Sequence, residues 1–479
     1  MMKSSELLVD TNHKNLLKNI LIVGLGKSGI SSVKYLVKYK DFFGKKISIS
    51  VYDKFKSVKE QKLLLKDLEI DEFYSGTFNT DICKENSYVV LSPGVSQKEV
   101  ICKGIFINDI FLFLDYIERI SSHLSQIRIV GITGTNGKTT TSYFLKHLMI
   151  RKNFKAHTAG NIGVSPLDLI DKLKDNDVVI LELSSFQLKP FIDIAFPRKL
   201  DIGILLNISP DHLDVHKNMN EYLNSKKALL RYSKRTIINI DLGQSVINEF
   251  NDITLGHSSS LANETKEKNW PKTNYNLITD NDSQHIIDNH GFNLNVERIK
   301  IPGKHNLFNI MAGIATFRCF ENDFDGYENI LSSFQGIPHR IEWTKKINGV
   351  DYFNDSKGTN VASTIAALES FKNKKIILIA GGDLKKQNLF PLKACLRKNV
   401  IALFLIGKDA DHFKEIFEDI DNLNIAICSS MEDAIFHAYD LAKKGDIVLL
   451  SPACASLDMY SNYVERGNHF KAIVNQIIL

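Results

Sequence analysis

Residues 131–140 read Gly-Ile-Thr-Gly-Thr-Asn-Gly-Lys-Thr-Thr and lie between the apolar run 127–130 and a stretch with helical periodicity. A strand, a glycine-rich turn and a helix in this order form a phosphate-binding loop, because the glycines let backbone N–H groups turn toward phosphate oxygens. The strict Walker pattern has glycine where this chain has Ile132, so the match is the shorter G-x-x-G-K-T. Lys138 is placed to reach the β- and γ-phosphates, and the Thr139 hydroxyl to ligate Mg²⁺. We therefore expect an α/β sheet that binds a nucleoside triphosphate.

The chain has 479 residues, more than one hydrophobic core usually holds, which predicts several domains. Its 60 Lys and Arg residues nearly balance 55 Asp and Glu residues and are scattered, so we expect no nucleic-acid partner. No apolar run reaches membrane-spanning length and the first residues contain no signal-peptide core, which predicts a cytoplasmic protein without membrane insertion. No coiled-coil seam is visible, so we expect a monomer.

The six cysteines are far apart in the sequence, and none forms a C-x-x-C pair. This spacing argues for free thiols in a reducing compartment. The residues concerned are Cys83, Cys102, Cys319, Cys395, Cys428 and Cys454.

The first predicted strand, residues 19–23, leads into the pattern Gly-x-Gly-x-x-Gly at 24–29. A second strand, 47–52, ends at Asp53, and an acidic residue at this position strengthens the outline of a dinucleotide fold. Nicotinamide or flavin binding is one interpretation, and a uridine diphosphate sugar is another, because a diphosphate satisfies the same helix N-terminus. The strand 88–91 brings Ser92 to the same edge of the sheet.

Two strands after the phosphate loop end in side chains that can bind a metal. Residues 178–181 lead to Glu182, and residues 202–206 lead to a segment that contains His212. Mg²⁺ prefers hard oxygen ligands, so Thr139 and Glu182 suffice for a first site that bridges the β- and γ-phosphates.

Two further segments carry no recognisable chemistry. The polar segment 258–289 predicts loops or an irregular hairpin, and we expect it, like residues 119–125, to be surface elaboration.

The last third of the chain predicts another doubly wound sheet. Apolar runs at 375–379, 401–405 and 447–450 alternate with helical stretches, after a turn-like segment at 336–340. The fold class is therefore α/β with three domains. We expect an N-terminal Rossmann-like domain, a central P-loop ATPase-like domain with a mostly parallel sheet and a C-terminal Rossmann-like domain, with limits 1–108, 109–337 and 338–479.

Together, these motifs resemble the Mur ligase family over nearly the whole chain, and they lie at 134–139, 182–187, 207–212, 303–306, 354–360 and 450–458. The last two resemble those of the members that add D-glutamate to UDP-N-acetylmuramoyl-L-alanine. The resemblance implies an ATP-dependent acid–D-amino-acid ligase of peptidoglycan precursor synthesis. In such a ligase the substrate carboxylate takes the γ-phosphoryl group, and the amine of D-glutamate attacks the resulting acyl phosphate.

The resemblance also implies roles for individual residues. The catalytic residues would be Lys138, Glu182, His212, Lys226 and Lys357. ATP would contact Gly134, Thr135, Asn136, Gly137, Lys138, Thr139, Thr140, Asn306, Asn309, His339, Arg340 and Asp355. Two Mg²⁺ ions would be held by Thr139, Glu182, His212 and a carbamylated Lys226, because the spacing from Tyr222 in the family points to Lys226 and not to the adjacent Lys227.

The two other substrates are assigned in the same way. The UDP-sugar would contact Lys27, Ser28, Asp53, Lys54, Ser92, Asn161 and His212. D-Glutamate would contact Thr359, Lys385, Ser456, Leu457 and Tyr463, where Lys386 is an alternative to Lys385.

Three other functions remain open at this point. Another amide ligase of the same superfamily is the nearest, and the motifs at 354–360 and 450–458 argue against it. A nicotinamide-dependent oxidoreductase would leave the phosphate loop unexplained. A non-catalytic nucleotide-binding regulator would leave Lys138 and Glu182 without a role.

Overall fold

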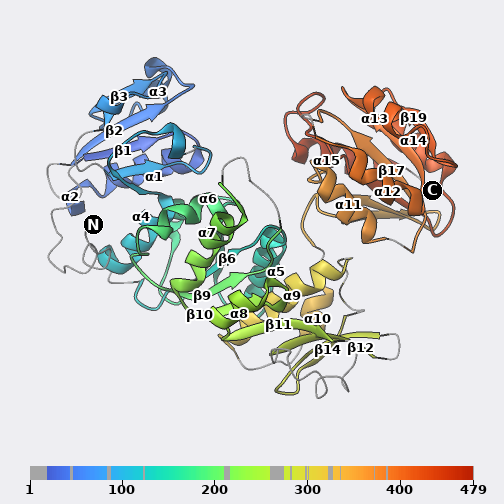
Figure 1. The fold of residues 1–479 in the computed structure, drawn as a ribbon, viewed down its shortest axis with the longest axis horizontal. Coiled ribbons are helices and arrows are strands. Elements are labelled where there is room, and N and C mark those ends of the chain that lie inside the picture. Colours follow the sequence, from blue (N-terminus) through green and yellow to red (C-terminus); the bar gives the residue numbers. More distant parts are fainter. Residues whose placement is uncertain are drawn as a thin grey trace. The chain divides into compact units, whose positions relative to one another are not determined.

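The computed structural model describes residues 19–43, 47–83, 88–95, 97–121, 124–209, 216–258, 274–280, 283–296, 299, 301, 303–321, 327–334, 336–371, 373–384 and 387–477. These residues form three β-sheets with helices packed beside them (Figure 1). The chain divides into two compact units, one made of Met1–Leu294 with Asn309–Asp323 and the other of Asn295–Phe308 with Phe324–Leu479.

The first sheet is fully parallel and has the strand order β3-β2-β1-β4-β5. Its strands are β1 (Asn19–Val23), β2 (Ser48–Asp53), β3 (Glu72–Ser75), β4 (Tyr88–Leu91) and β5 (Ile105–Ile107), with helices α1 (Lys27–Lys38), α2 (Lys40–Phe43) and α3 (Val58–Leu64). The order reverses between β1 and β4. Ligands of doubly wound sheets bind outside the carboxyl ends of the strands at such a reversal.

The second sheet is the largest, with nine strands in the order β14-β13-β12-β11-β10-β9-β6-β8-β7. From β7 to β12 the pairs are parallel, and β13 is antiparallel to β12. The strands are β6 (Arg128–Thr133), β7 (Ala156–Gly160), β8 (Val178–Glu182), β9 (Leu200–Leu205), β10 (Ser233–Asn239), β11 (Ile253–Ser258), β12 (Tyr275–Asp280), β13 (Ser283–Asp288) and β14 (Asn293–Asn295). Its helices include α4 (Asp109–Asp115), α5 (Lys138–Arg151), α6 (Ser185–Leu188), α7 (Met219–Arg231), α8 (Gln244–Glu249) and α9 (Lys304–Arg318).

The third sheet has six strands in the order β15-β16-β20-β17-β18-β19, of which only β15 is antiparallel to its neighbour. The strands are β15 (Glu342–Ile347), β16 (Val350–Asn354), β17 (Ile376–Gly381), β18 (Val400–Ile406), β19 (Asn424–Ile427) and β20 (Ile447–Leu450). The helices after Tyr327 are α10 (Tyr327–Ser332), α11 (Val361–Glu369), α12 (Phe390–Asn399), α13 (Ala410–Phe417), α14 (Met431–Leu441) and α15 (Tyr463–Gln476). Side chains of β17 alternate between two apolar clusters, as expected for a strand buried on both faces.

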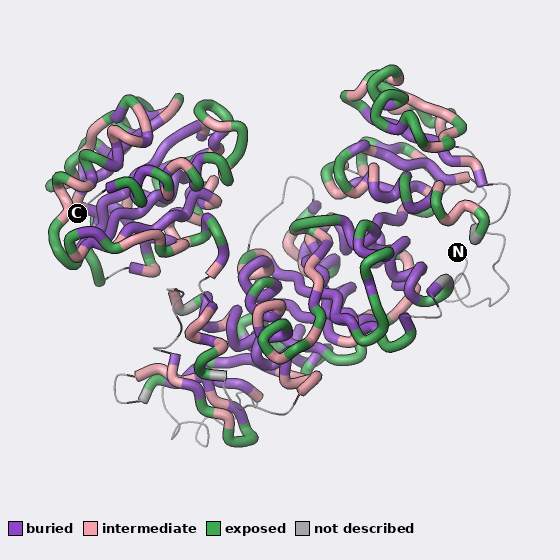
Figure 2. Tube along the Cα trace, turned by 180° about the vertical axis from the view of Figure 1, so that it is seen from behind, coloured by how far each residue is buried: buried purple, intermediate pink, exposed green. Residues whose placement is uncertain are grey.

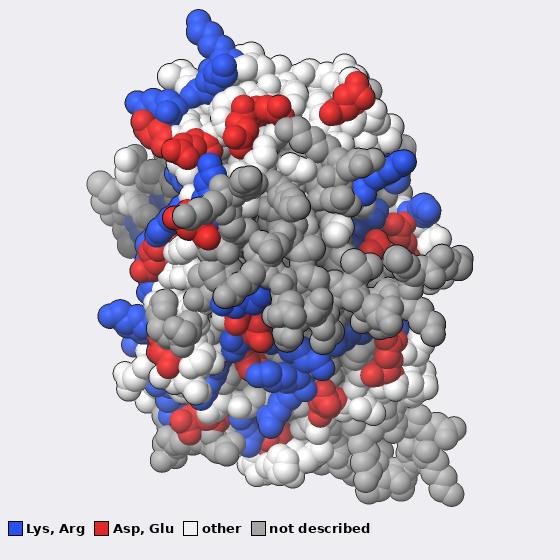
Figure 3. Space-filling model, turned by 90° about the vertical axis from the view of Figure 1, so that its left-hand side faces the viewer, with Lys and Arg blue, Asp and Glu red and all other residues white. Residues whose placement is uncertain are grey.

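Burial follows the sheets. In Figure 2 central strands such as β1, β8 and β17 are purple along most of their length, whereas the edge strands β3 and β19 are intermediate or exposed and green gathers on the loops and outer helix faces. On the face shown in Figure 3, Lys and Arg side chains are interspersed with Asp and Glu, in agreement with the scattered charge of the sequence. Within the described ranges, none of the helices combines the length and hydrophobicity that a membrane crossing requires.

Every strand predicted from an apolar run is present, and the turn predicted at 336–340 is closed by a hydrogen bond from the Arg340 N–H to the Ile337 carbonyl. Two segments differ from expectation. The polar segment contains the regular hairpin β12–β13, whose Leu277 and Ile286 are buried, so it extends the central sheet instead of decorating it. Leu124, in the other supposed surface segment, is fully buried and belongs to the apolar cluster that also contains Ile127 and Ile129.

The prediction of six free thiols is wrong for Cys83 and Cys102, which form a disulfide with Cα atoms 5.8 Å apart. Cys83 follows β3 and a short helical turn, and Cys102 precedes β5. Both pack against the small apolar cluster beside β4, so pairing of β5 with β4 brings the two loops together. Cys319, Cys395, Cys428 and Cys454 are free thiols.

Candidate active site

The phosphate loop connects β6 to α5 in a conformation that requires glycine. Gly134 has φ +154° and Gly137, the N-cap of α5, has φ +84°. A Cβ added to Gly137 would lie 2.1 Å from Oδ1 of Asn309 on α9, so the loop packs tightly against that helix. No side chain caps α5, which leaves its first N–H groups to an anion.

Asn207, at the end of the neighbouring strand β9, holds this loop from the other side. Its carbonyl accepts the N–H of Thr135 at 3.1 Å, and its Oδ1 accepts the N–H of Asn136 at 2.9 Å. Its Nδ2 donates back to the Asn136 carbonyl at 3.0 Å. The hydroxyls of Thr135 and Tyr222 lie 3.1 Å apart, which ties the loop to α7 as well. The loop is therefore preorganised by two neighbouring elements.

Two lysines converge on one carbonyl of this loop. The ammonium of Lys138 donates to the carbonyls of Gly134 and Thr135, each at 2.8 Å. The ammonium of Lys226, which is buried, donates to the same Gly134 carbonyl at 3.0 Å and lies 4.5 Å from the ring centre of Tyr222. The neighbouring Lys227 instead pairs with Glu249 on α8. Of the two adjacent lysines, Lys226 is the one that faces the phosphate loop.

Glu182 ends β8 beside the loop and is 2% exposed. Its Oε1 accepts a hydrogen bond from Nδ2 of Asn161 at 3.0 Å. Its Oε2 is buried and, within the described part of the chain, has no hydrogen-bond partner. Thr139 lies in the first turn of α5, next to β6, which pairs with β8. An unpartnered carboxylate oxygen and a threonine hydroxyl at one sheet edge fit the hard ligands that Mg²⁺ takes.

The glycine-rich turn of the first sheet is surrounded by different side chains. Asp53 accepts the N–H of Leu25 at 2.7 Å and those of Phe55 and Lys56 at 3.0 and 2.9 Å. Burial opposes ionisation of Asp53, but these N–H donors outweigh it and lower the pKa of the carboxyl. The Ser92 hydroxyl donates to the Gly24 carbonyl at 2.6 Å. Asp53 and Ser92 thus hold the turn at the edge where a ligand would bind.

The other residues predicted for the UDP-sugar are in three places. Lys27 and Ser28 begin α1, and Ser28 hydrogen-bonds the buried Asp109. Lys54 is half exposed and pairs with Glu99 at 3.0 Å. Asn161 follows β7 and contacts Glu182, as described above.

A pocket opens between the end of β4 and the helix α6. Its walls are mostly apolar, and its polar groups include Ser92, Asn108 and Gln187. The Asn108 side chain donates to the Gln187 carbonyl at 2.7 Å, which joins the start of α4 to α6. The pocket is lined by Leu91, Ser92, Pro93, Val95, Gln97, Asn108, Phe186, Gln187, Lys189 and Pro190.

In the third sheet, Asp355 and His339 are buried next to the turn that precedes β15. Asp355 accepts the Ser451 hydroxyl at 2.7 Å, yet burial dominates and raises the pKa of Asp355 to about 7. His339 has φ +66°, and its Nδ1 lies 3.0 Å from Nδ2 of Asn354. Burial and the nearby Lys471 lower the pKa of His339. Arg340 is exposed.

Arg466 on α15 fastens the two loops that carry the last motifs. Its guanidinium donates to the hydroxyl and carbonyl of Ser356 at 3.1 and 2.9 Å, and to the Cys454 carbonyl at 3.1 Å. The side chain is 1% exposed, and burial lowers its pKa to about 10. Beside it, the ammonium of Lys357 lies 5.4 Å from the ring centre of Tyr463.

The remaining predicted D-glutamate residues lie in the same unit. Thr359 is half-buried, Ser456 is buried and Leu457 is exposed. His212 and Lys385 lie outside the described residues.

Known proteins resemble this chain over nearly its full length. It is 34% identical over 483 residues to the UDP-N-acetylmuramoylalanine--D-glutamate ligase of Caldicellulosiruptor bescii, covering 96% of this chain and 98% of that one. It is 32% identical to the protein of the same name from Acetivibrio thermocellus, covering 96% and 97%.

The chain belongs to the Mur ligase family. Three family models match successive parts: a MurD-like N-terminal domain at residues 18–110, the Mur ligase middle domain at 132–317 and the Mur ligase glutamate ligase domain at 339–454. Each match contains one of the three sheets or most of it.

Solved structures of Mur ligases share the fold. The UDP-N-acetylmuramate-alanine ligase MurC of Thermotoga maritima has a TM-score of 0.55 at 16% identity, covering 95% of this chain and 99% of that one. The MurF ligase of Thermotoga maritima, solved in complex with ADP, has a TM-score of 0.56 at 16% identity, covering 100% and 98%.

Three residues support the site without a role predicted from the sequence: Asn207, His216 and Arg466. His216 is 1% exposed, and its Nε2 lies 3.0 Å from the Ser185 hydroxyl, so it supports the segment after β8. Asn207 lay inside a recognised motif, which was the available signal. Arg466 contacts mainly backbone carbonyls, and the sequence does not show such contacts because every residue has a carbonyl.

Proposed function

We propose that this Mur ligase uses ATP to join D-glutamate to UDP-N-acetylmuramoyl-L-alanine through an acyl phosphate, in peptidoglycan precursor synthesis. The observation that carries the proposal is that Lys138 and Lys226 meet at the Gly134 carbonyl of the loop between β6 and α5, while Glu182 ends the strand β8 that pairs with β6. The similarity to D-glutamate ligases over 96% of the chain supports the choice of substrates.

The chemistry begins with phosphoryl transfer. The terminal carboxylate of the UDP-sugar attacks the γ-phosphorus, ADP leaves, and an acyl phosphate remains. Lys138 supplies positive charge to the transferring group once phosphate replaces the loop carbonyls as its partner. The uncapped N–H groups of α5 act in the same direction. ATP would lie against the predicted loop residues 134–140 and against Asn306 and Asn309, which begin α9.

Two Mg²⁺ ions complete the proposal. Thr139 and Glu182 would hold one, and His212 and Lys226 the other. Bound Mg²⁺ neutralises the charge of the phosphates. The unpartnered Oε2 of Glu182 supports a metal there.

For Lys226 to bind a cation, its amine must add carbon dioxide and lose a proton. The carbamate so formed carries negative charge and two oxygen ligands. The position of Lys226 supports carbamylation. Its buried ammonium donates to the same carbonyl as Lys138 and so lies beside a second positive charge, which an anionic carbamate would instead balance.

The second step forms the amide bond. The ammonium of D-glutamate loses a proton to solvent and the free amine attacks the acyl carbon. The nitrogen of the tetrahedral intermediate then loses a second proton, and the intermediate collapses to the amide and inorganic phosphate. We propose that Lys357 stabilises charge in this step, while Thr359, Lys385, Ser456, Leu457 and Tyr463 bind D-glutamate. The buried Arg466 supports this assignment, since it holds the loops of these motifs rigid. His339, Arg340 and Asp355 would bind the nucleotide.

The UDP-sugar site is proposed at the strand reversal of the first sheet. Lys27 and Ser28 begin α1 there, and the pocket beside Ser92 offers apolar walls with a few polar groups, as ligand sites commonly do. Asp53, Lys54, Asn161 and His212 complete the predicted set. We further propose a cytoplasmic monomer, with domain limits 1–108, 109–337 and 338–479, into which the three sheets fall separately.

The deciding experiment is ATP-dependent phosphate release with UDP-N-acetylmuramoyl-L-alanine. D-Glutamate is compared with L-glutamate, meso-diaminopimelate and L-alanine as acceptors. We expect release with D-glutamate alone. Release with another acceptor would keep the amide ligase and change its substrate, and no release with any acceptor would overturn the proposal.

A further inference from the structure

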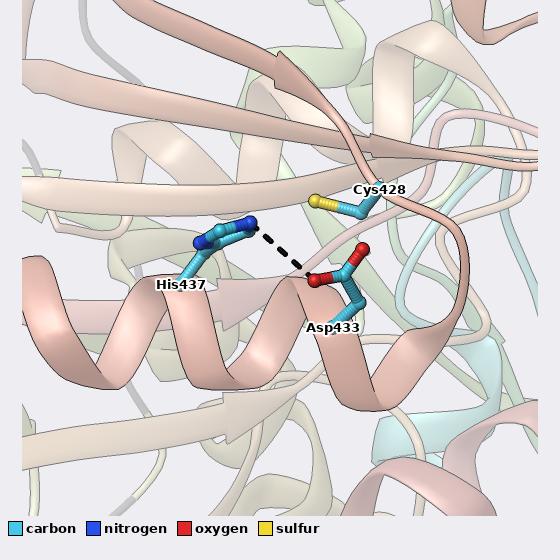
Figure 4. Close-up of side chains that lie close together, drawn as sticks. All are labelled: Cys428, Asp433 and His437. Atoms are coloured by element: carbon cyan, nitrogen blue, oxygen red, sulfur yellow. Dashed lines mark ion pairs between the residues drawn. The ribbon is translucent and has the colours of Figure 1, made fainter.

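A group of three different metal-binding side chains lies in the third sheet, apart from every residue assigned above. Cys428 directly follows β19, and Asp433 and His437 are four residues apart on α14. One ligand atom from each, a sulfur, an oxygen and a nitrogen, lies within 4.8 Å of the other two. Figure 4 shows the three side chains pointing toward one another.

The spacing is close to what one ion needs. Nε2 of His437 and Oδ1 of Asp433 are 3.4 Å apart. Two ligands of a tetrahedral zinc ion, at bond lengths of roughly 2.0–2.3 Å, are separated by about 3.3–3.8 Å. The oxygen–nitrogen pair already fits, and the sulfur lies within 4.8 Å of both atoms, so binding requires the Cys428 side chain to approach them. The four-residue separation on α14 places both side chains on one face of the helix.

Neighbouring residues hold the side chains of Asp433 and His437 in place while Oδ1 and Nε2 remain close to each other. The other oxygen of Asp433, Oδ2, accepts the Ser429 N–H at 2.8 Å and its hydroxyl at 3.0 Å, which fixes the carboxylate. The His437 ring is stacked on Phe404 of β18, with ring centres 5.6 Å apart. Held ligand side chains of this kind are typical of metal sites. An Asp433–His437 ion pair and packing of the buried Cys428 in the adjacent apolar cluster account for each residue singly, so a metal is indicated only by the three different ligand atoms lying together.

We propose that Cys428, Asp433 and His437 bind a zinc-like divalent cation, with water as the fourth ligand. The donor set favours this class, since thiolate and imidazole suit Zn²⁺ and poorly suit Mg²⁺. Binding displaces the thiol proton of Cys428 to solvent, so that the thiolate becomes the ligand. The site is independent of the proposed ligase chemistry and joins the end of β19 to α14.

The test uses the full chain, reduced and freed of metal with a chelator, and titrated with Co²⁺ in the presence of Mg²⁺. A cobalt–thiolate bond gives a charge-transfer absorption in the near ultraviolet that an oxygen site cannot give. We expect this absorption to appear at one equivalent and to be removed by Zn²⁺, which binds more tightly. Absence of the absorption in the wild type would overturn the proposal.

Matched variants make the test specific. Cys428→Ser and His437→Gln should each abolish the absorption. Cys395→Ser and His412→Gln should leave it unchanged, because Cys395 is also a buried thiol and His412 is as exposed as His437 but pairs with a glutamate one helical turn away. His437 lies on the surface, so His437→Gln is expected to fold even if Cys428→Ser does not. Absorption that persists in His437→Gln would overturn the site.

Discussion

The chain contains two glycine-rich turns, each of which joins a parallel strand to a helix that has no side-chain cap. The turn at 24–29 is held by a carboxylate, Asp53, which accepts its backbone N–H. The phosphate loop at 131–140 is held by an amide, Asn207, and faces two lysines. Glycine spacing thus shapes both backbones, whereas side chains from neighbouring elements decide the charge that each turn accepts. A triphosphate suits the second turn, because the ammonium groups of Lys138 and Lys226 lie beside it.

The largest effect is expected from removing a positive charge beside the phosphate loop. Lys226→Ala should lower turnover roughly 10²- to 10³-fold, the usual loss when one preorganised group at a reacting phosphoryl or acyl centre is removed. Lys227→Ala is the control, because Lys227 pairs with Glu249 away from the loop. It should keep near wild-type turnover and lose on the order of 1 kcal/mol of stability. Steady-state phosphate release gives the turnover of both variants. Equal losses of turnover in the two variants would refute the special role of Lys226.

A second change removes the charge that holds the first turn. Asp53→Asn leaves at least one backbone N–H without its acceptor and should lower the free energy of unfolding by about 1–3 kcal/mol. Because folding lowers the pKa of Asp53, its stabilisation is present above the unfolded pKa near 3.8 and is lost as pH falls through the folded value. Urea unfolding should show a wild-type advantage at pH 7 that narrows in acid. An advantage that persists in acid would mean that geometry, and not charge, holds the turn.

A third change compares the glycines themselves. In Gly137→Ala the added Cβ would clash with the Asn309 side chain, and the positive φ of residue 137 is strained for alanine. ATP affinity should therefore fall at least about tenfold, or 1.4 kcal/mol. Gly26→Ala occupies the corresponding N-cap of α1, where φ is −78° and no atom lies within 4 Å of the added Cβ. Its stability should stay within about 0.5 kcal/mol of wild type. Calorimetry of ATP binding and thermal unfolding test the pair, and similar losses in both would contradict it.

The smallest effect is expected for Lys54 at the first turn, where a role in substrate binding can be told apart from a role in stability. Lys54 forms only a half-exposed ion pair with Glu99, so Lys54→Ala should change stability by less than about 0.5 kcal/mol. If Lys54 binds the UDP-sugar, the KM for that substrate should still rise about two- to fivefold, because a lost charge contact costs roughly 0.5–1 kcal/mol. An unchanged KM would remove Lys54 from the site.

The sequence predicted the architecture because buried parallel strands are continuous apolar runs, and polar residues mark their ends. The resemblance favoured Lys226 over Lys227, but periodicity alone does not select one of two adjacent lysines, because successive helix positions differ by about 100° and packing fixes which one faces the loop. The sequence placed Asp53 at a strand tip but could not show that backbone N–H groups already occupy both of its oxygens. The Cys83–Cys102 pair was missed because strand pairing, and not sequence distance, joins their loops.

The position of β20 has a consequence for folding. This strand lies between β16 and β17, although it is made after both, and it completes the middle of the third sheet. Until it is synthesised, β16 and β17 have no shared partner, and each exposes an unpaired edge that can associate with another chain. We expect the third sheet to fold late on the ribosome, and a chain stalled before Ile447 to depend on chaperones.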